Sequence, residues 1–518
     1  MSPTTVEVPT AYGPVSGLID NGIASFRGIP YAAPPVGPNR FAAPVPPQTW
    51  SAPLPAHDFG PTPPQPPLKG KLGELFHNPI IPGDGYLNLN VWTSATGPGT
   101  GAAMPVLVWI YGGAFTTGSS AVTTYDGATF ARDGVVCVTL NYRLGVDGFA
   151  YIEDAPAPAN RGLLDQIFAL EWVRDNIAGF GGDPGNITVA GQSAGGMSVL
   201  TLLSLGRELF HRAIVESGTA HIGQTLQDAA LLTAAVATRL GVEPTAHALA
   251  EVSTAALITA QGQVSDDVTS SANPTRYGAS TIASCGMSFM PVIDGEVVPR
   301  LPIDAIADGQ GADVPLLIGT TAEEFRTFVV PTAMVAWLGA APFRTRTEVY
   351  GAPAGFYNRY AETSVEPYLR NAPSGVACAT LTDRMFRIPT YRIAEARGDA
   401  PATTHVFEFG WRSPTTPNNL RVKLGACHSL PLPFVWDRLD DPHSAEFTGP
   451  NPPQALADAL HGRWVEFVKT GELDQWAPYN TTERPVMTFY RDNTPNNVIV
   501  HDPRRDEREI WKNDLNPS

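Results

Sequence analysis

The sequence predicts an α/β fold, in which a mostly parallel β-sheet is flanked by helices. Short apolar runs rich in β-branched residues alternate with longer segments whose apolar residues recur at helical spacing. Two of the short runs lead into turns made of glycine and other small residues. Strands that alternate with helices in this way pair in parallel, and the helices cover both faces of the sheet.

The amino-terminal part, to about residue 70, favours extended segments and tight turns over helices. It is rich in proline and glycine, and Pro61–Pro67 is almost a polyproline segment. Proline fixes its own backbone and lacks the N–H that a helix interior needs. We therefore expect strands and turns in this part.

The middle of the chain contains the first predicted strand and helix pairs. Val106–Ile110 and Val135–Leu140 are short apolar runs typical of buried strands. The segment after them predicts an amphipathic helix, whose apolar residues are Leu163, Leu164, Ile167, Leu170, Val173 and Ile177. A third strand, Ile187–Ala190, is followed at once by a small-residue turn and the apolar stretch Met197–Leu203.

The later part of the chain continues this pattern with a longer helical interruption. Residues 222–310 are rich in alanine and broken by loops, and Pro315–Ile318 and His405–Phe409 predict two further strands. No internal repeat or sharp change in composition divides the chain. We therefore expect one domain over residues 1–518, with helical insertions around residues 222–310 and 330–400.

The composition is that of a globular protein with an acidic surface. A chain of 518 residues with 43% hydrophobic and 16% charged residues can bury a large core and enclose a deep pocket. Its formal net charge of −16 repels phosphate backbones and anionic lipid surfaces, so we expect no nucleic acid partner. No apolar run is long enough to span a membrane. The start of the chain has no signal-peptide pattern, which predicts a cytoplasmic protein. No pattern predicts the oligomeric state.

The four cysteines do not suggest a metal or redox site. They are Cys137, Cys285, Cys378 and Cys427, and no two of them form a Cys-x-x-Cys pair. Cys137 lies in an apolar run and is expected to be buried. A disulfide among the other three stays an open alternative.

The segment Thr188–Gly196 contains a Gly-x-Ser-x-Gly motif centred on Ser193. A β-branched strand runs into the motif and an apolar helical stretch leaves it, which is the strand–turn–helix that a nucleophilic serine needs. Gly191 and Gly195 lack the side chains that would clash in so tight a turn. The N–H of Ala194 begins the helix and points to where negative charge would develop. The alternative is a glycine-rich turn with an incidental serine.

Several blocks of the sequence are similar to those of one known family. Residues 180–195 carry Phe-Gly-Gly, then Ile-Thr-Val-Ala and Gly-Gln-Ser-Ala-Gly, and further blocks lie at residues 26–32, 40–41, 141–145 and 160–166. They resemble the type-B carboxylesterase/lipase family, which includes bacterial carboxylesterases and cholinesterases. The similarity runs from about residue 13 to Tyr479. The resemblance implies the α/β-hydrolase fold and a serine esterase that hydrolyses carboxylic esters.

An activated serine needs a base, and the base needs a third group that orients it. In this fold the acid and the histidine follow the serine in the chain. Residues 319–324 resemble the family block that ends in the catalytic glutamate, which implies that Glu324 is the acid and Glu323 a neighbouring loop charge. Residues 424–428 resemble the histidine block, which implies that His428 is the base.

The other late histidines have different surroundings. His405 lies within an apolar strand pattern and is expected in the core. His443, His461 and His501 lie in polar or helix-surface positions.

Residues 109–115, Trp-Ile-Tyr-Gly-Gly-Ala-Phe, follow a predicted strand and resemble the family's oxyanion loop. The resemblance implies that the N–H groups of Gly113 and Ala114 join that of Ala194 in stabilising the oxyanion. Losing one such donor costs roughly 3 kcal/mol of transition-state stabilisation. The alternative is a plain turn after a strand. The implied reaction passes through an acyl-enzyme and needs no cofactor and no metal, and the sequence has no dinucleotide, P-loop or His-Glu-x-x-His motif.

Four residues depart from the family pattern. Gln192 replaces a frequent glutamate, which weakens the case for cationic substrates. Tyr86 stands at a cysteine position, so the family's first disulfide is missing, which suits a reducing compartment. Phe325 replaces the usual glycine after the acid, and Pro431 a frequent glutamate after the histidine. The aromatic residues near the catalytic positions, Phe325, Phe434 and Trp436, belong either to the core or to an apolar pocket.

Three functions remain open from the sequence. The first is a broad carboxylesterase for neutral esters of short to medium chain length. The second is a specialised hydrolase of a bulky ester or a carbamate. The third is a non-catalytic binding protein of the same fold, which would typically lack the nucleophile. Ser193, His428 and the glycine-rich loop are all present, which disfavours the third function. The first function is preferred, with the second as its alternative, and the substrate stays undetermined.

Overall fold

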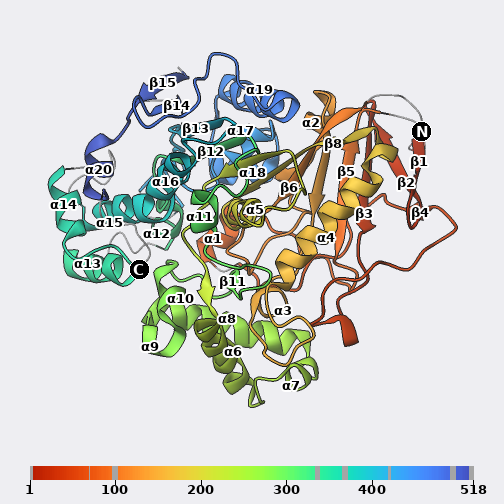
Figure 1. The fold of residues 1–518 in the computed structure, drawn as a ribbon, viewed down its shortest axis with the longest axis horizontal. Helices are drawn as coiled ribbons and strands as arrows, with labels where there is room; N and C mark the ends of the chain where they lie inside the picture. Colours follow the sequence, from red (N-terminus) through yellow and green to blue (C-terminus); the bar gives the residue numbers. More distant parts are fainter. Residues whose placement is uncertain are drawn as a thin grey trace.

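The protein is built around one large β-sheet (Figure 1). A computed structural model describes residues 4–68, 70–95, 103–332, 339–363, 372–417, 422–490 and 497–512. Within these residues the main sheet has 13 strands in the order β1-β2-β3-β5-β7-β6-β8-β9-β12-β13-β14-β15, with β4 paired to β2. The strands are β1 Thr4–Thr10, β2 Gly13–Asp20, β3 Ile23–Pro30, β4 Leu54–Pro55, β5 Asn88–Thr93, β6 Met104–Ile110, β7 Val136–Leu140, β8 Gly182–Gln192, β9 Arg212–Glu216, β12 Leu316–Thr321, β13 Thr404–Phe409, β14 Pro485–Phe489 and β15 Val498–His501. A separate pair is formed by β10 Gln224–Thr225 and β11 Val292–Ile293.

The centre of the sheet is parallel and its edges are antiparallel. From β7 through β6, β8, β9, β12 and β13 to β14, each neighbouring pair is parallel. At the amino-terminal edge, β1, β2, β3 and β5 pair antiparallel, and β14 and β15 do so at the other edge. The mostly parallel sheet and the helices around it confirm the predicted α/β-hydrolase fold. The short, turn-rich amino-terminal segments lack crossover helices, and neighbours joined by tight turns run antiparallel.

The central strands are apolar because they are covered on both faces. Every residue of β7 and β12 is buried, and β6 is buried from Val106 to Ile110. Each predicted strand overlaps an observed one, but Val135 and Pro315 lie just before β7 and β12, and β8 begins five residues before Ile187. The predicted helix over residues 163–177 is α4, Arg161–Asn176, and the apolar stretch after the motif is α5, Ala194–Ser204.

The remaining helices surround the sheet. Before the motif they are α1 Gly70–Leu75, α2 Ala128–Arg132 and α3 Gly145–Phe149. Between residues 222 and 310 they are α6 Leu226–Leu240, α7 Ala246–Ala250, α8 Thr254–Ser271, α9 Pro274–Tyr277, α10 Ala279–Ala283 and α11 Pro302–Ala307. The next group comprises α12 Arg326–Val329, α13 Ala340–Val349, α14 Phe356–Thr363, α15 Pro373–Thr382 and α16 Ile388–Ala396, and the last α17 Leu432–Val435, α18 Pro442–Thr448, α19 Gln454–Thr470 and α20 Arg505–Ile510. Figure 1 shows α6 to α10 gathered below the sheet and α13 to α15 at its left. These two groups lie in the intervals where helical insertions were expected, although residues 333–338 and 364–371 are outside the described part.

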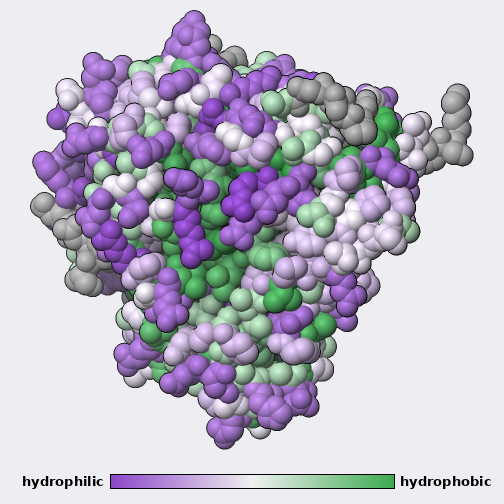
Figure 2. All heavy atoms as spheres, turned by 45° about the vertical axis from the view of Figure 1, so that its right-hand side comes forward, coloured by the Kyte–Doolittle hydropathy of each residue, from purple (hydrophilic) through white to green (hydrophobic). Residues whose placement is uncertain are grey.

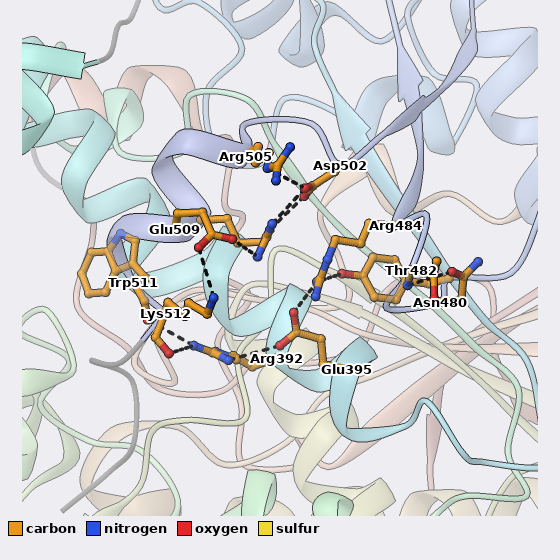
Figure 3. Close-up of polar contacts among 12 residues, drawn as sticks. Arg392, Glu395, Asn480, Thr482, Arg484, Asp502, Arg505, Glu509, Trp511 and Lys512 are labelled. Atoms are coloured by element: carbon orange, nitrogen blue, oxygen red, sulfur yellow. Dashed lines mark hydrogen bonds and ion pairs between the residues drawn. The ribbon is translucent and has the colours of Figure 1, made fainter.

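The carboxyl-terminal segment is fixed to α16 by a polar network (Figure 3). Arg392 of α16 donates to the carbonyl oxygens of Trp511 and Lys512 at 3.1 and 3.0 Å. Arg484 pairs with Glu395, which lies on the same helix. A π-helical turn, Asp383–Arg387, runs directly into α16. The helix that holds the carboxyl-terminal segment is thus continuous with the turn that carries Phe386, a residue of the cavity described below.

The surface is largely polar, in keeping with the acidic composition. Figure 2 shows one face on which polar residues predominate and hydrophobic residues gather near the centre. Among the described helices, none is both long and apolar enough to cross a membrane. The four cysteines form no disulfide with one another, and Cys137 is buried as expected.

Candidate active site

Ser193 lies in a strained turn between β8 and α5. Its backbone has φ 58° and ψ −126°, outside the regions that most residues other than glycine adopt. The N–H of Ser193 donates to the carbonyl oxygen of Glu216 at 2.9 Å, and its own carbonyl oxygen accepts from the N–H of Met197 at 2.8 Å. These two bonds hold the turn, and the side chain of Ser193 faces the cavity at the carboxyl ends of the parallel strands.

The two glycines of the motif are required by close packing. A Cβ on Gly195 would lie 1.9 Å from the carbonyl oxygen of Ile110, and one on Gly191 would lie 2.5 Å from the backbone of Gly195. Both distances are well inside van der Waals contact. The strand–turn–helix expected from the sequence is present, and the packing supplies its physical cause.

His428 and Glu324 are joined by a short hydrogen bond. Nδ1 of His428 lies 2.6 Å from Oε2 of Glu324, and both residues are buried. The other carboxyl oxygen of Glu324 accepts from the N–H of Thr321 at 2.7 Å, which fixes the side chain at the end of β12. The N–H of His428 donates to the carbonyl oxygen of Glu324 at 3.2 Å, and Thr327 donates to the carbonyl oxygen of His428 at 3.0 Å. Hydrogen bonds therefore fix both the ring and the backbone of His428.

Glu323 has a different place from Glu324. Its carboxylate accepts from the N–H of Ala426 at 2.7 Å and pairs with Arg412 at 3.1 Å. It supports the loop before His428 and does not contact the imidazole. In the same loop, burial raises the pKa of Cys427 to about 12, so this neighbour of His428 stays an uncharged thiol.

The glycine-rich loop after β6 borders Ser193. A Cβ on Gly112 would lie 2.9 Å from Cβ of Ser193, which places the loop against the serine. Gly113 has φ 120° and Ala114 φ 52°, so the chain turns sharply here. Gly112, Gly113 and Ala114 all line the same cavity as Ser193. As the first residue of α5, Ala194 has an N–H without an intrahelical acceptor.

The cavity has a volume of about 620 Å³ and is lined mainly by apolar groups. Aromatic and aliphatic side chains from several elements form its wall near His428, among them Phe325, Phe328, Met385, Phe386 and Leu432. The ring centres of Phe386 and Phe328 lie 4.9 and 5.4 Å from that of His428. Phe325 thus belongs to the pocket, whereas Phe434 and Trp436 are fully buried in the core.

The positions of the other histidines differ in part from those expected from the sequence. His405 is buried in β13, as expected. The surface position expected for His461 is wrong: it is buried, and its ring nitrogens contact the carbonyl oxygen of Val435 and a carboxyl oxygen of Asp133 at 2.8 and 3.0 Å. His443 is exposed on α18, but it also lines the cavity and stacks on His77. Sequence patterns missed the contacts of His461 with Asp133 and of His443 with His77 because the partners lie hundreds of residues apart.

The described residues also contain no group of three or more His, Cys, Asp or Glu side chains placed to hold a metal ion. The chemically distinctive features of the cavity are the serine side chain that faces it, the carboxylate-bound imidazole and the glycine-rich loop. Together with the fold, these features are typical of a hydrolase.

Comparison with known proteins identifies the family. A profile of the carboxylesterase family matches residues 4–511. The para-nitrobenzyl esterase of Bacillus subtilis is 35% identical over 519 residues, which cover 97% of each chain. The phenmedipham hydrolase of Pseudarthrobacter oxydans is 32% identical, covering 95% of this chain and 94% of its own. The crystal structure of a carboxylesterase from Geobacillus stearothermophilus superimposes with a TM-score of 0.83 at 32% identity, covering 98% of this chain and 100% of the other.

The chain therefore belongs to the carboxylesterase family. This confirms the family expected from the sequence blocks and the assignment to the carboxylic ester hydrolases. The substrate and the roles of individual residues need separate argument.

Proposed function

We propose that the protein is a serine carboxylesterase in which Ser193 is the nucleophile, His428 the general base and Glu324 the residue that orients the base. The observation that carries the proposal is the 2.6 Å contact between His428 Nδ1 and Glu324 in the wall of the cavity that Ser193 faces. The carboxylate keeps the proton on Nδ1, which makes Nε2 the nitrogen that accepts the serine proton.

The reaction proceeds in two halves. Ser193 Oγ attacks the ester carbonyl carbon while its proton passes to Nε2 of His428. The N–H groups of Gly113, Ala114 and Ala194 stabilise the negative charge on the carbonyl oxygen. The alcohol leaves with the proton from Nε2, and water then hydrolyses the acyl-enzyme by the same steps. Glu324 stabilises the positive imidazole in each half and keeps its own charge.

The preferred substrates are neutral esters of short to medium chain length. The cavity wall near His428 is aromatic and aliphatic, which favours apolar acyl and alcohol groups. The neutral side chain of Gln192 lies next to the serine, so this position adds no negative field that would attract a cation. A second candidate is a bulkier ester or a carbamate, which the volume of about 620 Å³ favours.

Burst kinetics with p-nitrophenyl acetate and p-nitrophenyl octanoate test the proposal. We expect the wild-type protein to release a burst of p-nitrophenol and Ser193→Ala to release none while remaining folded. Ser265→Ala is the matched control, because Ser265 lines the same cavity from α8 and is expected to keep the burst. Activity is expected to fall in acid, because a protonated base cannot accept the serine proton.

The rate of turnover of p-nitrophenyl octanoate relative to that of a bulky p-nitrophenyl carbamate separates the substrate candidates. Faster turnover of the octanoate than of a bulky carbamate supports the first candidate, and the reverse order supports the second. Appreciable turnover by Ser193→Ala would remove Ser193 from the mechanism.

A further inference from the structure

The base nitrogen of His428 already has a partner in the empty cavity. Because Nδ1 faces the carboxylate of Glu324, Nδ1 carries the proton and Nε2 presents a lone pair. The side-chain amide nitrogen of Gln192 lies 3.0 Å from Nε2 and donates to it. Among the described contacts there is no hydrogen bond between Ser193 Oγ and His428. The lone pair that should receive the serine proton is thus occupied by the glutamine.

Gln192 is held in this place by its surroundings. It is the last residue of β8, its Cα pairs with that of Glu216 in β9, and only 3% of its surface is exposed. A Cβ on Gly112 would lie 2.6 Å from the carbonyl oxygen of Gln192 and 3.1 Å from its Oε1. Because Gly112 has no side chain, the side chain of Gln192 has room between the oxyanion loop and the imidazole of His428.

The contact satisfies a buried acceptor. His428 is 3% exposed, and a buried lone pair without a donor is unfavourable. Ser193 is only half-buried and faces the cavity, where solvent is an alternative partner for its hydroxyl. In the resting protein the amide of Gln192 is thus the natural donor to Nε2.

We propose that Gln192 is a positioning residue that holds the imidazole of His428 in the resting enzyme and releases it when the substrate arrives. The inference rests on the proposed roles of Ser193 and His428. The N–H···N bond from Gln192 breaks, and the hydroxyl of Ser193 donates to Nε2 in its place. Oγ then bonds to the ester carbon as its proton moves to Nε2, and the alcohol later leaves with that proton.

A glutamine suits this role because its amide has both a donor and an acceptor. It donates to the neutral imidazole, and after rotation its oxygen accepts from the protonated ring. A glutamate in the same place would only accept, and its charge would favour the protonated ring throughout. The residue at position 192 therefore decides how readily the base becomes available.

The test compares acylation rates of the wild type, Gln192→Met and Gln192→Glu over pH 5 to 9, with p-nitrophenyl acetate in stopped flow. Methionine has a similar length and makes no hydrogen bond to Nε2. We expect Gln192→Met to acylate about fivefold faster at pH 8, which corresponds to about 1 kcal/mol, because no amide bond has to break. We expect Gln192→Glu to acylate more slowly at pH 7 and to move the acidic limb of the profile upward by about one pH unit or more.

Gln224→Met is the control for loss of a buried glutamine, because Gln224 is 1% exposed and donates to Thr281 and to the carbonyl oxygen of Ser288. We expect Gln224→Met to have the same acylation rate and pH profile as the wild type. A purely structural role for Gln192 predicts slower acylation in both variants with the acidic limb unchanged, and that result overturns the inference. If Gln192→Met does not fold, an unmoved limb in Gln192→Glu overturns it equally. The absence of a burst in the wild type would instead reject the proposed function.

Discussion

The carbonyl oxygen of Glu216 accepts a hydrogen bond from the N–H of Ser193, with an N···O distance of 2.9 Å. Glu216 ends β9, and its side chain is buried close to the turn that contains Ser193. One carboxyl oxygen accepts from Trp464 Nε1 at 2.9 Å, and the other has no hydrogen-bond partner among the described residues. Burial raises the pKa of Glu216 to about 8, so a neutral carboxylic acid prevails here at pH 7.

This arrangement predicts that Glu216 lowers the stability of the protein as the pH rises. The pKa of Glu216 in the folded protein, about 8, lies above the ordinary value of 4.5. The contribution of Glu216 to stability is therefore complete below pH 4.5 and decreases as the pH rises to about 8. The loss has a slope of up to about 1.4 kcal/mol per pH unit. Glu216→Gln keeps the shape and has no such loss. We expect its stability relative to the wild type to increase from pH 5 to pH 8, measured by urea unfolding.

Glu153→Gln is the control for this measurement, because Glu153 is exposed. Its stability difference from the wild type should stay nearly constant over the same range. Parallel pH profiles for Glu216→Gln and the wild type would contradict the prediction.

Glu324→Gln is expected to lower kcat by about 10⁴-fold with little change in KM. The amide can donate to Nδ1 of His428, which favours the tautomer with its proton on Nε2 and removes the base. Glu324 does not itself line the cavity, so substrate binding should persist. Steady-state kinetics with p-nitrophenyl acetate measure the effect.

Glu323→Gln serves as the neighbouring control. Its contacts with Arg412 and Ala426 stabilise the loop, so we expect a lower melting temperature and a much smaller loss of kcat. Equal losses of kcat in the two variants would argue that both act only through folding.

The turn that contains Ser193 could be predicted because the residues that form it are close together in the sequence. Gly191, Ser193 and Gly195 lie within five residues of one another, and the strand before them is apolar. The sheet centre was predictable for the same reason, since each buried strand is a short apolar run. Glu324 was placed by family resemblance, and its contact with His428 depends on the pairing of β12 with β13.

Contacts between distant segments were not predictable from patterns. The burial of His461 depends on Val435 and Asp133, and nothing around His461 in the sequence indicates either partner. The contact between Gln192 and His428 joins residues 236 positions apart. A departure from the family pattern at Gln192 marked the position, but only the packing shows which atom it faces.

Gly195→Ala is expected to destabilise the protein by about 3 kcal/mol, because a Cβ would lie 1.9 Å from the carbonyl oxygen of Ile110 and the backbone would have to shift to admit it. Gly462→Ala is the matched control. Gly462 lies within α19, and a Cβ there would meet no atom within 4 Å. Alanine should stabilise that helix by about 0.5 to 1 kcal/mol. Thermal unfolding of both variants checks the opposite signs, and a stable Gly195→Ala would show that the turn can open.

The stacked rings of His77 and His443 predict that one wall of the cavity loosens in acid. Their centres lie 3.6 Å apart with an interplanar angle of 7°, and they join the segment after α1 to α18. Burial, and then the charge of His443, lower the pKa of His77, while Asp441 opposes this. The stabilising contribution of His77 is therefore present above its ordinary value of 6.5 and is lost as the pH falls through its lowered pKa.

Hydrogen exchange of residues 70–78 at pH 7.5 and pH 5, corrected for the intrinsic rates, measures this loosening. We expect the wild type to lose protection as the pH falls from 7.5 to 5, because protonation of His77 places a charge on a partly buried ring stacked on His443. His77→Phe keeps an aromatic ring against His443 without this charge, so its protection should change less between the two pH values. The contact of Phe76 with Phe447, with ring centres 5.0 Å apart, bears no charge and stays in both proteins. If the wild type and His77→Phe lost protection equally, the protonation of His77 would not be the cause.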